Sequence, residues 1–193
     1  MGNRRLGAQR LNALLRHGST GTDTAFQAGA GISGAVKSHR IIKDGVFLIT
    51  EIVLDLGTSE TDIRSSSVDR PIGTHGSTAS AHLMLWEDDV HGVLQSTETY
   101  IMEALTTVTA CSLAIGDNEA AIDVALTNRA DVNAGFATSA KRVGAGVVNS
   151  ATTDGKYIFI TGDNNADTTL NAGQLVIRLI GMKTLVGRVV TLV

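Results

Sequence analysis

The sequence is poor in the residues on which disulfide, thiolate and stacking chemistry depend. Cys111 is the only cysteine among 193 residues, which excludes an internal disulfide and a zinc site built from several thiolates. Its neighbours are typical of a strand, so we expect a small buried side chain. Aromatic residues are also few: one tryptophan, two tyrosines and four phenylalanines. A core must therefore be built from valine, isoleucine, leucine and alanine.

Long apolar runs are missing as well. No segment approaches the roughly 18 uncharged apolar residues that a membrane-spanning helix needs, so no membrane partner is expected. The first residues include arginines but lack the apolar stretch of a signal peptide. We therefore expect synthesis in a cytoplasm, without export by that route.

Charge is scarce. Charged residues make up 18% of the chain, below the usual quarter, and the formal net charge is −3. A chain of this kind has no overall attraction for nucleic acid, which makes nucleic acid an unlikely partner. Low charge combined with abundant glycine, alanine, threonine and serine predicts a surface that other molecules cover. Identical copies of the chain are the simplest covering.

The clearest helical pattern lies in residues 3–16, where Ala8, Leu11 and Leu15 follow the spacing of one apolar stripe. A helix this short needs a surface to pack on, because it is marginal alone in water. The glycine-, serine- and threonine-rich residues that follow have the composition of a flexible linker. Residues 1–38 are therefore predicted to form an N-terminal arm, a short helix on a tether.

The arm is predicted to bind a neighbouring protein. Its arginines also suit a nucleic acid backbone, but the interleaved leucines favour a protein surface with acidic spots, and a solvated tail is the remaining alternative. The residues predicted to bind the partner are Arg4, Arg5, Leu6, Arg10, Leu11, Leu14, Leu15 and Arg16.

Residues 39–193 have the sequence pattern of a β-domain. Short apolar runs alternate with polar turns, which predicts an all-β fold, an antiparallel sandwich or a barrel-like, jelly-roll-like domain. The stretch 58–80, which holds the only proline (Pro71), is predicted to be a long surface excursion. The segments predicted to form strands are 46–56, 81–86, 99–105, 107–115, 121–126, 157–161, 174–180 and 185–193.

One glycine-rich segment matches a cofactor motif. Residues 29–34 read Gly-Ala-Gly-Ile-Ser-Gly, and Asp55 follows about 20 residues later, as in dinucleotide-binding proteins. That motif requires a hydrophobic strand before it, a helix after it and alternating strands and helices beyond, and the sequence has none of these. No cofactor is therefore expected.

Three groups of acidic residues are candidates for ion or catalytic sites. Residues 87–91 (Glu-Asp-Asp-Val-His) are predicted to form an acidic turn, because consecutive residues do not converge on one metal. Residues 163–167 resemble the start of a calcium loop, but Thr168 and Gln174 replace the required glycine and glutamate, which favours a hairpin loop. On the predicted strands, the carboxylates are expected to be exposed or paired with Arg178; they are Glu51, Asp55, Glu98 and Glu103. No catalytic residue is predicted, and the chain is not expected to be an enzyme.

Both ends of the chain resemble a known class of protein. The opening Gly-Asn-Arg-Arg-Leu-Gly-Ala-Gln-Arg-Leu, the linker, and the closing segments 157–163 and 171–181 resemble β-rich virion structural proteins of tailed bacteriophages, those of marine bacteria in particular. The resemblance implies a capsid-associated or other virion component without an enzymatic site. In such families, accessory head proteins sit on the outer shell and clamp neighbouring capsomers.

The expected function is therefore a capsid decoration (cement) protein, located in the virion and made in the host cytoplasm. Its expected partners are other copies of itself, as a trimer or another symmetric cluster, and the major capsid protein or another virion protein. A tail, baseplate or head-fibre component is an alternative within the same class. A small ligand- or carbohydrate-binding β-module is an alternative from another class, although it would require clustered aromatic residues.

Overall fold

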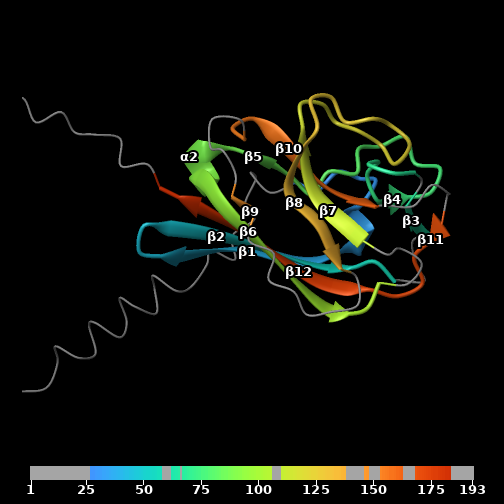
Figure 1. The fold of residues 1–193 in the computed structure, drawn as a ribbon, viewed down its shortest axis with the longest axis horizontal. Coiled ribbons are helices and arrows are strands. Elements are labelled where there is room, and N and C mark those ends of the chain that lie inside the picture. Colours follow the sequence, from blue (N-terminus) through green and yellow to red (C-terminus); the bar gives the residue numbers. More distant parts are fainter. Residues whose placement is uncertain are drawn as a thin grey trace, which may run out of the picture.

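The computed structural model describes residues 27–57, 62–65, 67–105, 110–137, 146–147, 153–162 and 168–183. These residues form two packed antiparallel sheets and a small third sheet, which confirms the predicted all-β sandwich (Figure 1). The elements are η1 (Ser33–Ala35), β1 (Val36–Asp44), β2 (Phe47–Asp55), β3 (Ile63–Ser65), β4 (Gly73–Thr74), β5 (Met84–Trp86), α2 (Asp88–His91), β6 (Val93–Glu103), β7 (Ala110–Gly116), β8 (Ala130–Ala137), β9 (Gly146–Val147), β10 (Lys156–Gly162), β11 (Thr168–Thr169) and β12 (Gln174–Met182).

The larger sheet has five strands in the order β1-β2-β12-β6-β9. Strands β2 and β12 lie at its centre because both alternate apolar residues over nine positions, the pattern of a strand with one face in the core. Their pairing is in register along the full length, with Ile52 opposite Ile177 and Leu54 opposite Leu175. The side chains of these four residues point inward and are fully buried.

The second sheet has four strands in the order β5-β10-β7-β8, and the third joins β11, β3 and β4. The core lies between the two large sheets and is aliphatic, apart from Trp86 and a few small residues. Near β6 and β8 the layers adjoin, because the Thr97 hydroxyl donates to the Val132 carbonyl at 3.1 Å.

The short helix α2 closes the core beneath one end of the five-stranded sheet. His91 on α2 is fully buried, and its Nδ1 lies 3.1 Å from the Thr50 hydroxyl on β2. The indole N–H of Trp86 donates to Asp88 Oδ1 at 3.0 Å. The rings of Trp86 and His91 lie with their centres 4.9 Å apart, tilted by 32°. The acidic turn predicted at 87–91 is therefore this helical turn, and its histidine faces the core.

Three sequence expectations are wrong. Residues 121–126 form turns instead of a strand. Ile122 and Leu126 are nevertheless buried, Leu126 in a small core with Ala114 and Phe159, which produces the alternation without strand pairing. Strands β10 and β12 belong to different sheets, so they do not form a hairpin. The stretch 58–80 is more than a surface excursion, because Ile63 and Ile72 are fully buried in the core.

The described part of the predicted linker is packed on the β-domain. Ile32 and Ala35 are fully buried in the main core, and β1 already begins at Val36. A Cβ atom at Gly29 would lie 2.1 Å from the Ser80 carbonyl oxygen, and one at Gly31 would lie 2.6 Å from that of Ala79. The two glycines therefore permit close backbone packing, where the motif had suggested a cofactor loop.

Candidate interaction surface

The five-stranded sheet presents one side away from the four-stranded sheet, and we call this side the outer face. Its side chains come from alternate positions of β1, β2, β12 and β6, and the strand pairing aligns them in rows across the sheet. One charged row lies between apolar rows. The sequence predicted β2, β12 and part of β6 but missed β1. It did not predict the rows, because rows depend on register between distant segments.

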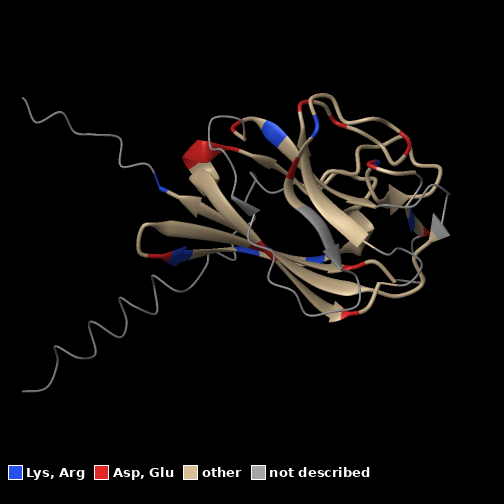
Figure 2. Cartoon of the chain, in the orientation of Figure 1, with Lys and Arg blue, Asp and Glu red and all other residues tan. Residues whose placement is uncertain are grey.

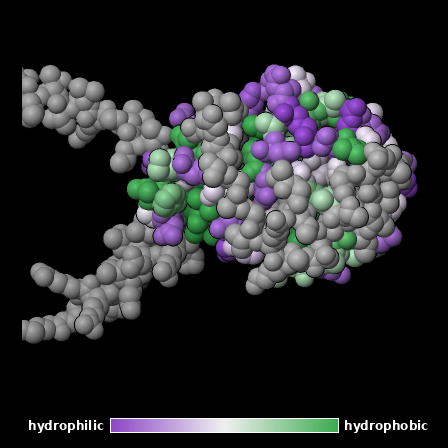
Figure 3. Space-filling view, in the orientation of Figure 1, coloured by the Kyte–Doolittle hydropathy of each residue, from purple (hydrophilic) through white to green (hydrophobic). Residues whose placement is uncertain are grey.

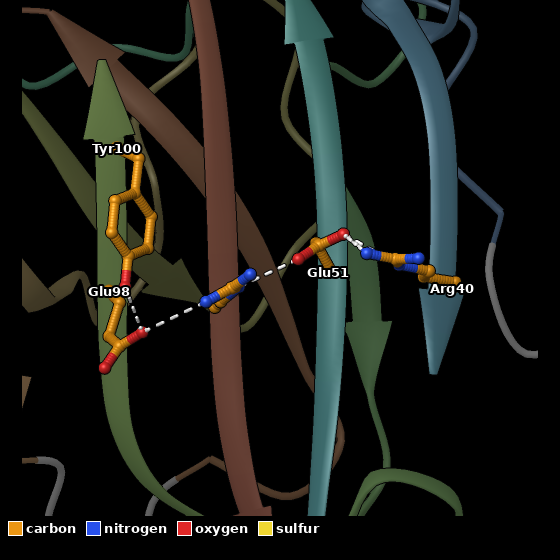
Figure 4. A network of polar contacts seen from close by, with 5 residues as sticks. Arg40, Glu51, Glu98 and Tyr100 are labelled. Carbon is orange, nitrogen blue, oxygen red and sulfur yellow. Dashed lines mark hydrogen bonds and ion pairs between the residues drawn. The ribbon is translucent and has the colours of Figure 1, made fainter. Parts of the chain in front are cut away.

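The charged row alternates in sign across four strands, and we call it the ladder. Its members, in strand order, are Arg40, Glu51, Arg178 and Glu98 (Figure 4). The Arg40 Nε donates to Glu51 Oε1 at 2.7 Å, and the Arg178 Nε donates to Glu51 Oε2 at 2.8 Å. Arg178 also reaches Glu98, with 4.0 Å between Nη1 and Oε2. Each internal charge thus lies between two charges of opposite sign.

Tyr100 completes the Glu98 end of the ladder. Its hydroxyl donates to Glu98 Oε2 at 2.8 Å, and the Arg178 guanidinium carbon lies 5.1 Å from its ring centre. The latter distance suits a cation–π contact. The hydrogen bond to Glu98 and the charge of that carboxylate raise the pKa of Tyr100.

Glu51 is the most enclosed charge of the ladder, with only 8% of its side chain exposed. Burial by itself raises the pKa of Glu51, but the hydrogen bonds from Arg178 and Arg40 outweigh it and the pKa lies below its usual value. The hydrogen bond to Glu51 raises the pKa of Arg178 in turn. Both groups are therefore held in their charged forms.

The rows beside the ladder are apolar. On one side lies the isoleucine row, which pairs Ile42, Ile49 and Ile180 across β1, β2 and β12. On the other side lies the valine row, which pairs Val53 with Val176. All five side chains are only partly buried.

Beyond the isoleucine row, the sheet ends in exposed apolar residues. Phe47 opposes Met182, and their exposed fractions are 41% and 40%. Val46, in the turn between β1 and β2, is 49% exposed. Figure 3 shows hydrophobic surface at this end of the molecule, around the β1–β2 hairpin. The outer face as a whole thus offers water a broad apolar area, with charges confined to defined lines.

The other large sheet has a different outer side. The loop 117–129 lies over it, and a second small core forms from Ala114, Ala120, Leu126 and Phe159, with Tyr157 at its margin. Polar contacts hold the loop in place. Asp117 pairs with Lys156, and the Tyr157 hydroxyl donates to Glu119 Oε1 at 3.2 Å. Figure 2 shows acidic residues along this loop.

A serine and a histidine lie close together where the described chain begins. Ser80 Oγ is 2.7 Å from His82 Nδ1, and His82 Nε2 is 2.9 Å from the Gln27 carbonyl oxygen. Both ring nitrogens therefore have structural partners, and the Nε2 contact ties the chain around Gln27 to the sandwich. Burial lowers the pKa of His82 despite these partners.

Two of the four carboxylates predicted on strands lie beside Arg178. Glu51 and Glu98 pair with Arg178, as the sequence analysis allowed, while Asp55 accepts a bond from the Gly57 amide at 3.2 Å and Glu103 is exposed. Sequence reasoning missed Arg40 and Tyr100. The signal for both was their alternation with the core-facing residues of their strands.

Three predictions concern residues outside the described ones: the partner-binding residues of the arm, the acidic loop 163–167 and the strand 185–193. Among the residues that are described, no three His, Cys, Asp or Glu side chains gather as a metal site. Within the same residues, none of the helices has the length and apolar character to cross a membrane. Cys111 on β7 is buried, as expected.

Comparison of the chain with protein-family models, with curated proteins and with solved structures finds no match.

Proposed function

We propose that this chain is a virion structural protein, a capsid decoration protein that attaches to the outer shell of a phage head and stabilises it. The observation that carries the proposal is the outer face, because apolar rows that remain partly exposed are typical of a surface that another protein covers. The resemblance of both chain ends to phage virion proteins supplies the class of assembly. The low proportion of charged residues fits a protein with much covered surface.

The proposed mechanism is purely energetic. The outer face buries apolar area against other copies of the chain, while residues 1–26 reach a neighbouring shell protein through their leucines and arginines. A standard interface buries roughly 800 Å² per partner, and several modest interfaces on one particle add through multivalency. The shell then resists internal pressure because many joints are bridged at once.

The test is attachment to heads. Empty heads assembled from the major capsid protein of the same genome are mixed with the purified chain and sedimented. We expect the chain to sediment with the heads at a fixed stoichiometry. The proposal fails if the chain stays in the supernatant, or if labelling of virions places it on the tail, which would favour the tail-component alternative.

A truncation tests the arm separately. Removal of residues 1–17 should leave the β-domain folded, because the described core begins with Ala28 and Ile32. The truncated chain should sediment with heads less than the full chain does at equal concentration. Equal sedimentation of the two chains would exclude this role for the arm.

A further inference from the structure

We propose that two copies of this chain pair through their outer faces, about a twofold axis that runs parallel to the strands between β2 and β12. The inference deepens the self-association in the proposed function and takes its biological setting from it. The pairing itself follows from the order of side chains on the face and can be tested without a virion.

The ladder provides the first argument. Its charges read plus, minus, plus, minus from β1 to β6, and this order is complementary to its own reverse. The proposed axis reverses the strand order of the second copy. Arg40 then faces Glu98 of the second copy, and Glu51 faces its Arg178. Every charge of the ladder meets an opposite charge, both beside it and across the interface.

The apolar rows provide the second argument, because an axis parallel to the strands keeps each row opposite the same row of the second copy. Ile49 on β2 faces Ile180 of the second copy on β12, and Val53 faces Val176. At the exposed end, Phe47 faces Met182. Apolar residues therefore meet apolar residues in all three rows on the two central strands, while Ile42 on β1 faces Ser96 of the second copy on β6.

Other axes do not give this match. A twofold axis along the ladder, perpendicular to the strands, places Arg40 opposite Arg40 and Glu51 opposite Glu51. An axis along β2 places Arg40 opposite Arg178. Like charges held face to face oppose association, so the charge order selects the axis between β2 and β12. Aligned sheets cross at roughly 30°, which keeps the central pairs closest.

The size of the face approaches that of a standard interface. Four strands about 4.8 Å apart and nine residues of about 3.4 Å each cover roughly 19 by 30 Å. The flat area is then about 570 Å², and the relief of the side chains raises the accessible area toward the roughly 800 Å² per partner of a standard interface.

The first experiment measures the mass of the purified chain by light scattering at several concentrations. We expect twice 20.1 kDa for the natural sequence. Ile49→Lys should raise the dissociation constant at least about tenfold, because it places a charge against Ile180 of the second copy. The matched control is Val124→Lys, on a residue 45% exposed in the loop 117–129, which should leave the dimer unchanged.

The proposal is overturned by a natural chain that remains monomeric at high concentration, by a trimer, or by an Ile49→Lys variant that dimerises as well as the Val124→Lys control. Circular dichroism before each measurement confirms that the variants are folded. A dimer that does not bind heads would contradict the proposed virion role and leave this pairing intact. A monomer that binds heads would do the reverse.

The second experiment tests the charge order itself. A variant with all four charges reversed (Arg40→Glu, Glu51→Arg, Arg178→Glu and Glu98→Arg) keeps an alternating ladder and should pair with itself. Mixed with the natural chain, it would place like charges opposite one another at every ladder position, so mixed dimers should be at least about tenfold rarer than random exchange predicts. Tagged and untagged natural chains should exchange freely. Random mixing of the reversed and natural chains would overturn the proposed axis. If the reversed variant does not fold, the comparison of Ile49→Lys with Val124→Lys tests the proposed pairing by itself.

Discussion

The two large sheets of this sandwich treat their outer sides differently. The four-stranded sheet is covered by the chain itself, through the loop 117–129 and the small core around Phe159. The five-stranded sheet keeps the apolar residues of its outer face partly exposed, in rows that flank the ladder. One outer side is thus covered within the monomer. The other leaves apolar side chains partly exposed, a pattern typical of a surface that binds a second molecule.

The difference lies in how charge is placed. Over the four-stranded sheet, charged residues lie in the covering loop and pin it to the strands, as Asp117 does with Lys156. On the five-stranded sheet, the charges lie within the face, between apolar rows. A paired row of charges inside an apolar face keeps that face hydrated in the monomer. It also restricts which partners can bind the face and in which register.

Phe159→Ala should have the largest effect on the monomer. Phe159 is fully buried beneath the loop, so its removal should lower the free energy of unfolding by about 3–5 kcal/mol. Urea denaturation at a concentration at which the chain is monomeric measures the change, and Ile180→Ala on the partly exposed outer face is the comparison. Equal losses from the two variants would mean that the two sides do not differ as described.

Leu126→Ala should weaken the cover of the four-stranded sheet. Leu126 is 8% exposed and anchors the far end of the loop, so the expected loss is about 2 kcal/mol, at the low end for leucine truncation. Amide hydrogen exchange should accelerate in residues 117–129 before it does so in β2 and β12. Uniform acceleration would show that the loop unfolds only together with the whole domain.

Glu51→Gln should weaken the ladder by about 1–2 kcal/mol, because two arginines lose their shared carboxylate. Both arginines are more than a third exposed, which limits the loss through hydration. Glu51→Leu, which adds apolar area to the face, serves as the comparison. A Glu51→Gln variant as stable as the natural chain would mean that the ladder contributes specificity alone.

The ladder should also lose stability in acid. The pKa of Glu51 in the folded chain lies below the 4.5 of the free side chain, so its contribution is complete above pH 4.5 and is lost as the pH falls through the lower folded value. The free energy of unfolding should therefore fall more steeply below pH 4.5 for the natural chain than for Glu51→Gln. Parallel curves for the two proteins would contradict a lowered pKa.

Tyr100→Phe should have the smallest effect. It removes the hydrogen bond to Glu98 but keeps the ring near Arg178, so the expected loss is under about 0.5 kcal/mol. Thermal unfolding measured beside Glu51→Gln provides the scale. A loss as large as that of Glu51→Gln would mean that Tyr100 and Glu98 on β6 contribute as much to the stability of the ladder as Glu51 on β2 does.

The sequence predicted the elements with strong local patterns and missed those without. Strands β2, β10 and β12 have long apolar runs, and each was found within a few residues of its bounds. Strand β1 was missed because its burial is weak and its charges interrupt the pattern, and β8 because alanine, glycine and asparagine carry little strand signal.

The candidate surface was predictable only in part. Arg178 is a charge inside an apolar strand, and the sequence therefore predicts a carboxylate partner for it. Which carboxylate it meets depends on register between β2, β12 and β6, and these strands are separated by loops that local sequence does not fix. Arg40 entered the ladder only once β1 was paired with β2.

The ladder also constrains how this sequence can evolve. A single sign change at Glu51 would set three positive side chains side by side on β1, β2 and β12. Viable descendants are therefore expected to keep all four signs, or to exchange them together, or to lose the charges in neighbouring pairs. Four positions spread over nearly 140 residues of chain would then be inherited as one unit, and their joint variation among relatives would record the pairing of strands that are distant in the gene.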